Sequence, residues 1–253
     1  MKVTVLGTAT STGVPVVGCE CNVCRSSDPR NKRTRTSVLV SESGKNLLID
    51  TPPDFHQQAL SNRITRIDAV LYTHDHADHV FGLDELRIFN FIQESPIPIY
   101  GNRKTIARIK KIFDYIWDEQ APVGGGKPML KAHAVKGGFQ PAGIEVLPVE
   151  IWHGKQTILG YRIGDFAYLT DCSGIPEASR EALRGLKLLI LGALRFRPHP
   201  THFSFSAAVA EIRRLKPARA LLTHLSHSFD PAEEEFFASQ QVELAYDGMV
   251  VEI

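Results

Sequence analysis

Thr73-His74-Asp75-His76-Ala77-Asp78-His79 follows directly on the apolar run from Ala69 to Tyr72. Three imidazoles and two carboxylates fall within six consecutive positions, more than a polar turn needs for hydrogen bonding. Neutral imidazole and carboxylate both bind first-row divalent metals such as Zn, Mn, Fe and Ni. In an extended segment His74 and His76 share one side, whereas Asp78 and His79 can point to a second position just beyond it. The stretch therefore predicts a metal-binding turn behind a buried strand.

Length and charge narrow the class of protein. The chain has 253 residues, with 29 basic and 28 acidic side chains and a formal net charge of +1. We expect one α/β domain over residues 1–253, although two domains would also fit this length. The balanced charge provides no overall field that would draw the chain to nucleic acid or anionic lipid. With no run of about 18 apolar residues and no signal-peptide pattern, we expect a cytoplasmic protein without a membrane partner.

Short β-type runs alternate with helical patterns along the whole chain. Strands are predicted at 2–6, 36–40, 46–50, 69–72, 97–100, 144–149, 158–163, 166–170, 186–191, 218–223, 242–244 and 249–253. Helices are predicted at 53–62, 78–90, 103–116, 176–184, 204–215 and 231–239. The strands arrive in two similar halves, which indicates two sheets packed face to face with helices outside. The glycines of 124–126 and 137–138 predict a flexible loop beside the site.

Three further metal-competent residues stand at the ends of predicted strands. His153, Asp171 and His224 each follow an apolar run, far from one another along the chain. A single His or Asp at a strand end is more often satisfied by hydrogen bonds than by a metal. Together with the cluster at 74–79, however, the three indicate that strand ends converge on one point.

His74, His76, Asp78 and His79 match the motif His-x-His-x-Asp-His, and the chain thereby resembles the metallo-β-lactamase fold superfamily. The resemblance covers most of the chain and implies an α/β fold, a four-layer αββα sandwich with two metals at one edge. It implies one metal on His74, His76 and His153, a second on Asp78, His79 and His224, and Asp171 as the bridge. We expect Asp78 and Asp171 to be catalytic residues as well as ligands. Asp50 matches an Asp that orients ligands by hydrogen bonds.

The cysteines point to one branch of this superfamily. Gly7 to Pro15 and the cluster Cys19-Glu20-Cys21-Asn22-Val23-Cys24 look like the phosphodiesterases related to PhnP of the carbon–phosphorus lyase pathway. In that branch three cysteines and a later histidine bind a structural zinc, which Cys19, Cys21, Cys24 and His227 match. Cys3His is a closed tetrahedral set without a vacancy for water. The alternative is that these three cysteines are buried or redox thiols without a metal. For the remaining cysteine, Cys172, we expect a buried thiol with no role of its own.

The branch also carries a histidine that the resemblance aligns with His202. An imidazole that reaches the leaving oxygen can act as general acid or stabilise charge on the phosphoryl group. His199 matches no residue of the branch, and we expect His56 and His133 to be ordinary surface or loop residues. The basic residues at 30–35 are explained equally well by a solvated surface and by phosphate binding. For the basic residues at 195–197, substrate contact is slightly favoured over a solvated surface.

The resemblance implies a phosphodiesterase that hydrolyses a small cyclic or nucleotide-like phosphodiester, of the phosphoribosyl cyclic phosphate type, through a metal-bridging hydroxide. It requires two divalent ions, Zn or Mn with Fe or Ni as alternatives, and one structural Zn. A tRNA 3′-processing ribonuclease and another metallo-β-lactamase-fold hydrolase remain as alternatives. The expected partner is a small phosphorylated substrate, with nucleic acid disfavoured and a homodimer compatible with the family. The natural substrate and the metal identity stay open.

Overall fold

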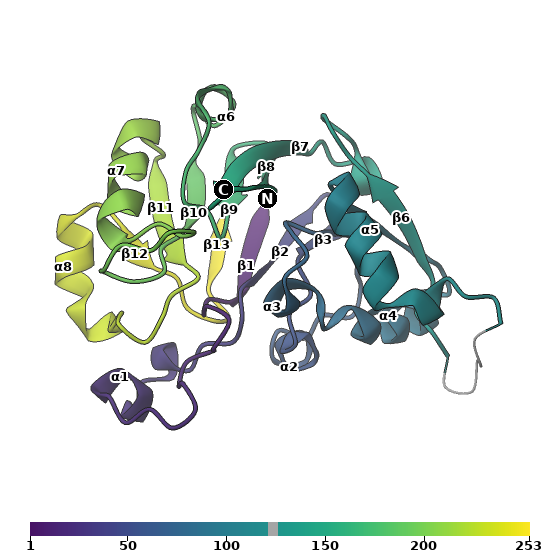
Figure 1. Cartoon of the computed structure of the whole chain (residues 1–253), viewed down its shortest axis with the longest axis horizontal. Helices are drawn as coiled ribbons and strands as arrows, with labels where there is room; N and C mark the ends of the chain where they lie inside the picture. The colour runs from purple at the N-terminus through teal and green to yellow at the C-terminus, as the bar shows by residue number, and fades with distance from the viewer. Residues whose placement is uncertain (121–125) are drawn as a thin grey trace.

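A computed structural model of the chain describes residues 1–120 and 126–253. It contains two sheets that lie face to face in the middle of the molecule (Figure 1). The first has the strand order β13-β1-β2-β3-β4-β5-β6, with β1 (Lys2–Gly7), β2 (Ser37–Glu42), β3 (Lys45–Ile49), β4 (Ala69–Leu71), β5 (Ile97–Gly101), β6 (Leu130–Ala134) and β13 (Val250–Glu252). The second has the order β12-β11-β10-β9-β8-β7, with β7 (Leu147–His153), β8 (Gln156–Ile163), β9 (Phe166–Leu169), β10 (Leu188–Gly192), β11 (Arg219–Thr223) and β12 (Glu243–Leu244).

Helices cover the outer faces of both sheets (Figure 1). On the first sheet lie α2 (Phe55–Ser61), α3 (Ala77–Val80), α4 (Leu86–Gln93) and α5 (Arg103–Ile112), and on the second α6 (Glu177–Glu181), α7 (Phe205–Leu215) and α8 (Glu234–Ser239). The short α1 (Asn22–Arg25) stands apart in an N-terminal excursion. Single 3-10 turns lie at Pro29–Asn31, Leu83–Glu85, Asp114–Ile116, Pro141–Gly143 and Pro231–Glu233. Within the described residues, no helix combines the length and apolar character needed to cross a membrane.

The alternation of side chains along the strands builds three apolar layers. In β3, Leu47 and Ile49 pack against the second sheet, whereas Leu48 between them packs against the helices of the first. Leu189 and Leu191 of β10 face α7 in the same way. Because successive residues of a strand point to opposite faces, both faces of each sheet are buried. The predicted four-layer αββα sandwich is therefore confirmed.

Parallel pairing aligns the strand ends that carry the predicted ligands. Ile49 of β3 pairs with Leu71 of β4 in the first sheet. In the second sheet Leu191 of β10 pairs with Leu169 of β9 on one side and with Leu222 of β11 on the other. The carboxyl ends of parallel strands meet at the same edge of a sheet, so the residues that follow them are brought together.

Three secondary-structure predictions were wrong. The edge strand β6 was not predicted, because its half-exposed sequence Leu-Lys-Ala-His-Ala lacks β-branched residues. The predicted strand at 144–149 is shifted, since Val146 pairs with Phe139 and β7 begins at Leu147. The predicted helix at 78–90 is interrupted at Gly82, where a Cβ would lie 2.1 Å from the Pro52 carbonyl oxygen. Of the predicted glycine-rich loop, residues 124 and 125 lie outside the described residues.

Candidate active site

The predicted ligands stand directly behind, or at the ends of, strands from both sheets. Asp50 follows β3, His74 and His76 follow β4, His153 ends β7, Asp171 follows β9 after Thr170, and His224 follows β11. Asp50, Asp171 and His224 have φ angles of +63°, +56° and +57°, in the left-handed region that few residues other than glycine adopt. Such conformations cost free energy and concentrate at functional sites. The surrounding structure therefore holds the turns at these three strand ends in place.

One group of potential ligand atoms lies on the β4 side of Asp171. His74, His76 and Asp171 offer atoms that all lie within 4.8 Å of one another, and so do His153, Asp171 and His202. The rings of His76 and His153 are 5.1 Å apart between centroids. His153 donates its Nδ1 proton to the Asp171 carbonyl oxygen at 2.6 Å, which leaves its Nε2 for a metal. These atoms could hold the first ion that the sequence predicts.

A second group lies on the β11 side of the same aspartate. Asp78, His79, Asp171 and His224 offer atoms within 4.8 Å of one another. Asp171 Oδ1 lies 3.3 Å from His79 Nε2 and 3.0 Å from His224 Nδ1. Asp171 is thus the one residue common to all three groups of the site, as a bridging ligand would have to be.

Two nitrogen atoms in the site show that the residues fit a metal. Nε2 of His74 and Nε2 of His79 are buried, and neither has a hydrogen-bond partner among the described residues. On the other side of each ring, Nδ1 of His74 meets Thr73 Oγ1 at 3.0 Å, and Nδ1 of His79 meets Asp50 Oδ2 at 2.8 Å. A buried polar atom without a partner is costly, and two divalent ions, one beside each ring, would satisfy the two nitrogens.

The electrostatics of the site favour charged carboxylates beside neutral imidazoles. Burial opposes ionisation of Asp171, but the neighbouring His224 and His79 hold the pKa of this carboxyl well below its usual range. Burial, followed by the proximity of His79, lowers the pKa of His74, so its ring is neutral and able to bind a metal. His79 differs, because Asp171, Asp78 and Asp50 overcome the effect of burial and raise its pKa. Three carboxylates around one imidazole are a site of excess negative charge, which suits a cation.

His202 lies beside this cluster on the loop before α7. Its ring is 4.8 Å from that of His153 and 5.0 Å from that of His224, between centroids. Burial lowers the pKa of His202 to about 3, so the ring is neutral at neutral pH in the free protein. Its Nδ1 is buried without a hydrogen-bond partner among the described residues. His202 therefore lies beside the cluster as a neutral imidazole.

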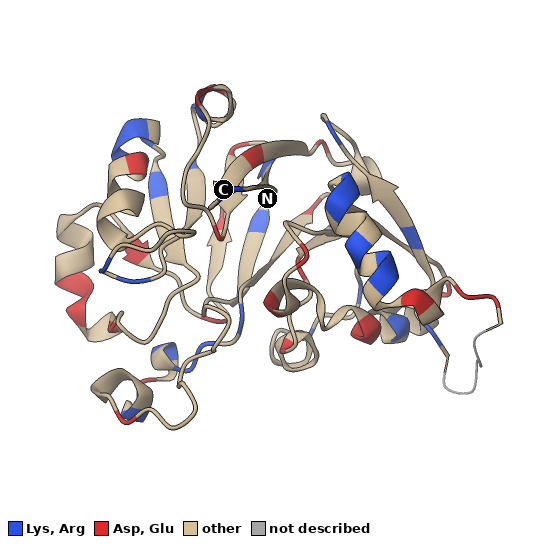
Figure 2. Ribbon diagram, viewed as in Figure 1, with Lys and Arg blue, Asp and Glu red and all other residues tan. Residues whose placement is uncertain are grey.

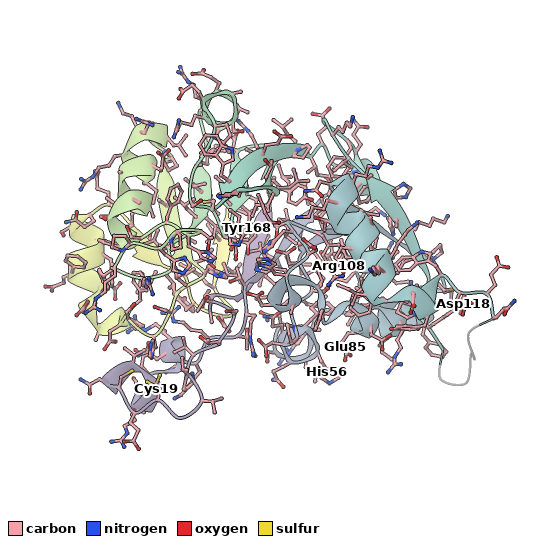
Figure 3. The ribbon with its side chains drawn as sticks, viewed as in Figure 1. Cys19, His56, Glu85, Arg108, Asp118 and Tyr168 are labelled. Carbon is pink, nitrogen blue, oxygen red and sulfur yellow. The ribbon has the colours of Figure 1, made fainter. Side chains whose placement is uncertain are left out.

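The four residues predicted for a structural zinc come together in the excursion around α1. Sγ of Cys19, Cys21 and Cys24 lie 3.2, 3.5 and 3.4 Å from the same atom, Nδ1 of His227. Tetrahedral zinc with the usual Zn–S and Zn–N bond lengths gives a sulfur-to-nitrogen separation of about 3.5 Å. All three cysteines are free thiols in the structure. Figure 3 shows Cys19 far from the centre of the sandwich, where Tyr168 is labelled. This cluster is therefore a second site, separate from the first.

An open cavity of about 440 Å³ gives access to the first site. Its walls include residues to which the sequence analysis assigned no role: Ser11, Lys155, Gln156 and Thr201. Lys155 lies in the turn between β7 and β8 and Gln156 begins β8, and only their position just after His153 and Gly154 could have indicated them. Thr10 and Thr36 were also missed, although their hydroxyls lie 3.1 and 3.2 Å from the two ring nitrogens of His224.

Several residues considered from the sequence lie elsewhere. His56 pairs with Glu85 at 3.0 Å on the surface (Figure 3), and His133 stacks on Tyr100 at the edge strand β6. Cys172 is a fully buried thiol, and burial raises its pKa. Charged side chains occur on both halves of the molecule, with a basic run along α5 (Figure 2). The basic run at 30–35 is not a solvated face throughout, because Arg33 is only 3% exposed.

The αββα sandwich with clustered His and Asp residues at its strand ends defines a metal-dependent hydrolase of the metallo-β-lactamase fold. Residues 45–225 match the family described as the beta-lactamase superfamily domain, and the chain belongs to that family.

Individual relatives refine this placement. A crystal structure described as a new diphosphatase from the PhnP family superposes with a TM-score of 0.92 at 43% identity, covering 100% of this chain and 97% of that one. The chain is thus of the PhnP-like branch that the cysteine cluster indicated. Zinc-bound PqqB from Methylobacterium extorquens shares the fold at a TM-score of 0.81 and 20% identity, over 100% of both chains. A Porphyromonas gingivalis protein named octanoyltransferase is 41% identical over 254 residues, 98% of this chain but 51% of that protein, so the chain spans about half of its length.

Proposed function

We propose that the protein is a dinuclear metal-dependent phosphodiesterase that hydrolyses a small cyclic or nucleotide-like phosphodiester. The observation that carries the proposal is the position of Asp171, whose carboxylate lies within reach of both ligand groups at the floor of an open cavity. Two ions held in this way would supply an acidified water and positive charge against the phosphoryl oxygens.

The residues of the chain divide the remaining work. His74, His76 and His153 would hold one ion, Asp78, His79 and His224 the other, and Asp171 both. His202 would face the leaving oxygen, because neither ion is assigned to it and its ring lies 4.8 Å from that of His153 and 5.0 Å from that of His224, between centroids. An anionic phosphodiester next to His202 favours the protonated ring, which can then donate its proton to the leaving alkoxide.

Lys155 is the cationic side chain among the described residues that line the cavity. It stands in the turn after β7, next to Gln156, whose Oε1 accepts a hydrogen bond from Lys104 Nζ at 2.5 Å. A cation at the wall adds attraction for a phosphate beyond the two ions and would orient the non-reacting part of the substrate. A small phosphorylated molecule therefore fits this cavity better than a neutral ester.

A second candidate is hydrolysis of a diphosphate, favoured by the 43% identical structure that is described as a diphosphatase. Both reactions place a nucleophile in line with a leaving oxygen at phosphorus, and both need the same charge stabilisation. They differ in the leaving group. A phosphate can depart without receiving a proton, whereas an alkoxide needs a proton as it leaves. The octanoyltransferase name carries no argument for this chain, because half of that protein lies outside the match.

The cysteine cluster would hold a structural zinc, and we propose that the chain forms one domain around both sites. Protein reconstituted with Zn or Mn should hydrolyse bis(p-nitrophenyl) phosphate, cyclic ribose phosphates or nucleoside diphosphate esters. Asp171→Asn should abolish this activity, and His56→Ala, on the surface beside Glu85, should leave it unchanged. Activity on thioesters or β-lactams with none on any phosphate ester would overturn the proposal.

A further inference from the structure

A second cavity, of about 360 Å³, lies between α8, β12 and the segment that follows the cysteine cluster. It shares no lining residue with the cavity over the histidine cluster. Its walls are mainly apolar, with Phe237, Val242, Leu244 and Met249 among them, and Arg33 and Arg30 add charge. Small-molecule sites typically have this volume and this combination of apolar walls with few polar groups.

Arg33 has an unusual environment for a cation. Its side chain is buried, and its Nη1 donates to Thr8 Oγ1 at 3.0 Å and to the Ala245 carbonyl oxygen at 2.5 Å. Nε and Nη2 are also buried, and neither has a hydrogen-bond partner among the described residues. These two nitrogens form one edge of the guanidinium, the edge that pairs side-on with the two oxygens of a carboxylate, sulfonate or phosphate.

The acidic residues nearby do not occupy this edge. Of the two that line the cavity, Glu234 pairs with Arg30 at 3.5 Å and Glu243 pairs with Arg219 at 2.7 Å. Asp247 makes no direct hydrogen bond with Arg33: Thr8 lies between them and donates its hydroxyl to Asp247 Oδ1 at 2.8 Å. The charges of Asp247, Asp28 and Asp230 act on Arg33 through space, without a contact to the Nε–Nη2 edge among the described residues. Burial lowers the pKa of Arg33 to about 10, so it remains cationic at neutral pH. A buried cation with a free edge is costly and is stabilised by an anion.

We propose that this cavity binds a small organic anion, with one carboxylate, sulfonate or phosphate group on the Nε–Nη2 edge of Arg33 and an apolar body against Phe237 and Val242. Both nitrogens are covered in the empty cavity, so binding requires a side chain at its rim to move. Glu234 can do so, because its side chain is 80% exposed and its pair with Arg30 is long. Rearrangements of this size are common on ligand binding.

The probe is 1-anilinonaphthalene-8-sulfonate, an apolar aromatic body with one sulfonate, titrated by fluorescence into the metal-loaded protein. We expect saturable binding of one molecule per chain. Its uncharged parent, N-phenyl-1-naphthylamine, should bind at least ~10-fold more weakly, because it lacks the sulfonate that would accept charge-assisted hydrogen bonds from Arg33. Equal affinity for the two compounds would overturn the proposal, since it would show an apolar cavity without a role for Arg33.

Two matched variants locate the site. Ala238 is exposed on α8 and lines the cavity, whereas Ala232 is exposed in the 3-10 turn that precedes α8 and does not line it. Ala238→Trp should fill the mouth and weaken binding at least ~10-fold, and Ala232→Trp should bind as the unmodified protein does. Arg33→Lys keeps the charge but loses the two-nitrogen edge, and should also weaken binding. Equal binding in the two Trp variants places the probe elsewhere and overturns the proposal; if Arg33→Lys unfolds, the comparison of charged and uncharged probe still decides.

Discussion

Asp50 accepts a hydrogen bond from Nδ1 of His79 at 2.8 Å, and the same carboxylate accepts two more from the backbone and side chain of Thr73. Both Asp50 and His79 are fully buried. The bond fixes the proton of His79 on Nδ1 and turns Nε2 toward Asp78 and Asp171. An aspartate at the end of β3 thus determines which nitrogen of a residue 29 positions later faces the candidate metal site.

Asp50→Asn should therefore weaken metal binding without removing any ligand. The amide has one accepting oxygen instead of two, so it cannot accept all three hydrogen bonds from His79 and Thr73. Loss of such an outer hydrogen bond typically lowers metal affinity by about 10- to 100-fold. Titration calorimetry with Zn measures this. Asp68→Asn is the control, because that carboxylate is almost as buried but pairs with Arg66 away from the site. Unchanged zinc affinity in Asp50→Asn would contradict the role assigned here.

Metal removal should separate the two sites. The histidine cluster opens into a cavity, whereas the thiolate cluster is a closed set of four ligands. Mild chelation should remove the ions held around Asp171 and leave about one zinc per chain on the cysteines. Elemental analysis before and after chelation checks this, and a protein that keeps its fold with no metal at all would refute it.

Cys21→Ser should lower thermal stability rather than turnover. Binding energy at a structural metal site is folding energy, so loss of one thiolate should reduce the melting temperature by about 5 °C or more. Zinc content should fall by one equivalent while the ions around Asp171 remain. Cys172→Ala is the comparison, because this buried thiol should not change the zinc content. A Cys21→Ser protein that melts like the unmodified one, with all metals retained, would rule out the structural zinc.

His202→Ala should reduce turnover according to the leaving group. On a diester with an alkoxide leaving group the loss should be roughly 10²- to 10⁴-fold, because proton donation contributes about that much. A p-nitrophenolate departs without a proton, so bis(p-nitrophenyl) phosphate should be affected much less. Steady-state kinetics on both substrates, with metal content measured alongside, tests this. Equal losses on the two would mean that His202 only binds phosphate.

Asp247 should make stability depend on pH. Burial raises its pKa to about 6, although Thr34 and Thr8 donate hydrogen bonds to it. An acid whose pKa is raised on folding stabilises the protein below its unfolded pKa of about 3.9, and this contribution is lost as the pH rises through 6. The free energy of unfolding of Asp247→Asn, relative to the unmodified protein, should therefore rise by up to about 3 kcal/mol between pH 4 and pH 7.

Urea unfolding at the two pH values measures this difference. The relative stability of Asp68→Asn should instead fall between the two pH values. Burial acts to raise the pKa of Asp68, but hydrogen bonds from Arg66 and the Asn46 backbone outweigh burial and lower this pKa. The prediction fails if the free energy of unfolding of Asp247→Asn, relative to the unmodified protein, falls as the pH rises. That result would show that Asp247 is ionised in the folded protein at pH 4.

Much of the fold and the site could be predicted from the sequence because the signals are local. The apolar run before His74 defines a buried strand, and the density of ligand-type residues behind it has no structural explanation. The spacing of Cys19, Cys21 and Cys24 indicates a metal cluster for the same reason. Successive side chains of a strand point to opposite faces of the sheet. Leu47 and Ile49 therefore pack against the second sheet, whereas Leu48 packs against the helices of the first.

Only the tertiary structure decided which distant residues meet. The sharing of Asp171 by all the histidine groups depends on the parallel order of β9, β10 and β11, which no local pattern contains. The same holds for Arg33, which in the sequence belongs to an ordinary basic run but is covered in the fold by α8 and β12. Burial and contact are properties of the whole chain, so a short-range pattern states what a side chain can do, whereas the sheet topology determines what it touches.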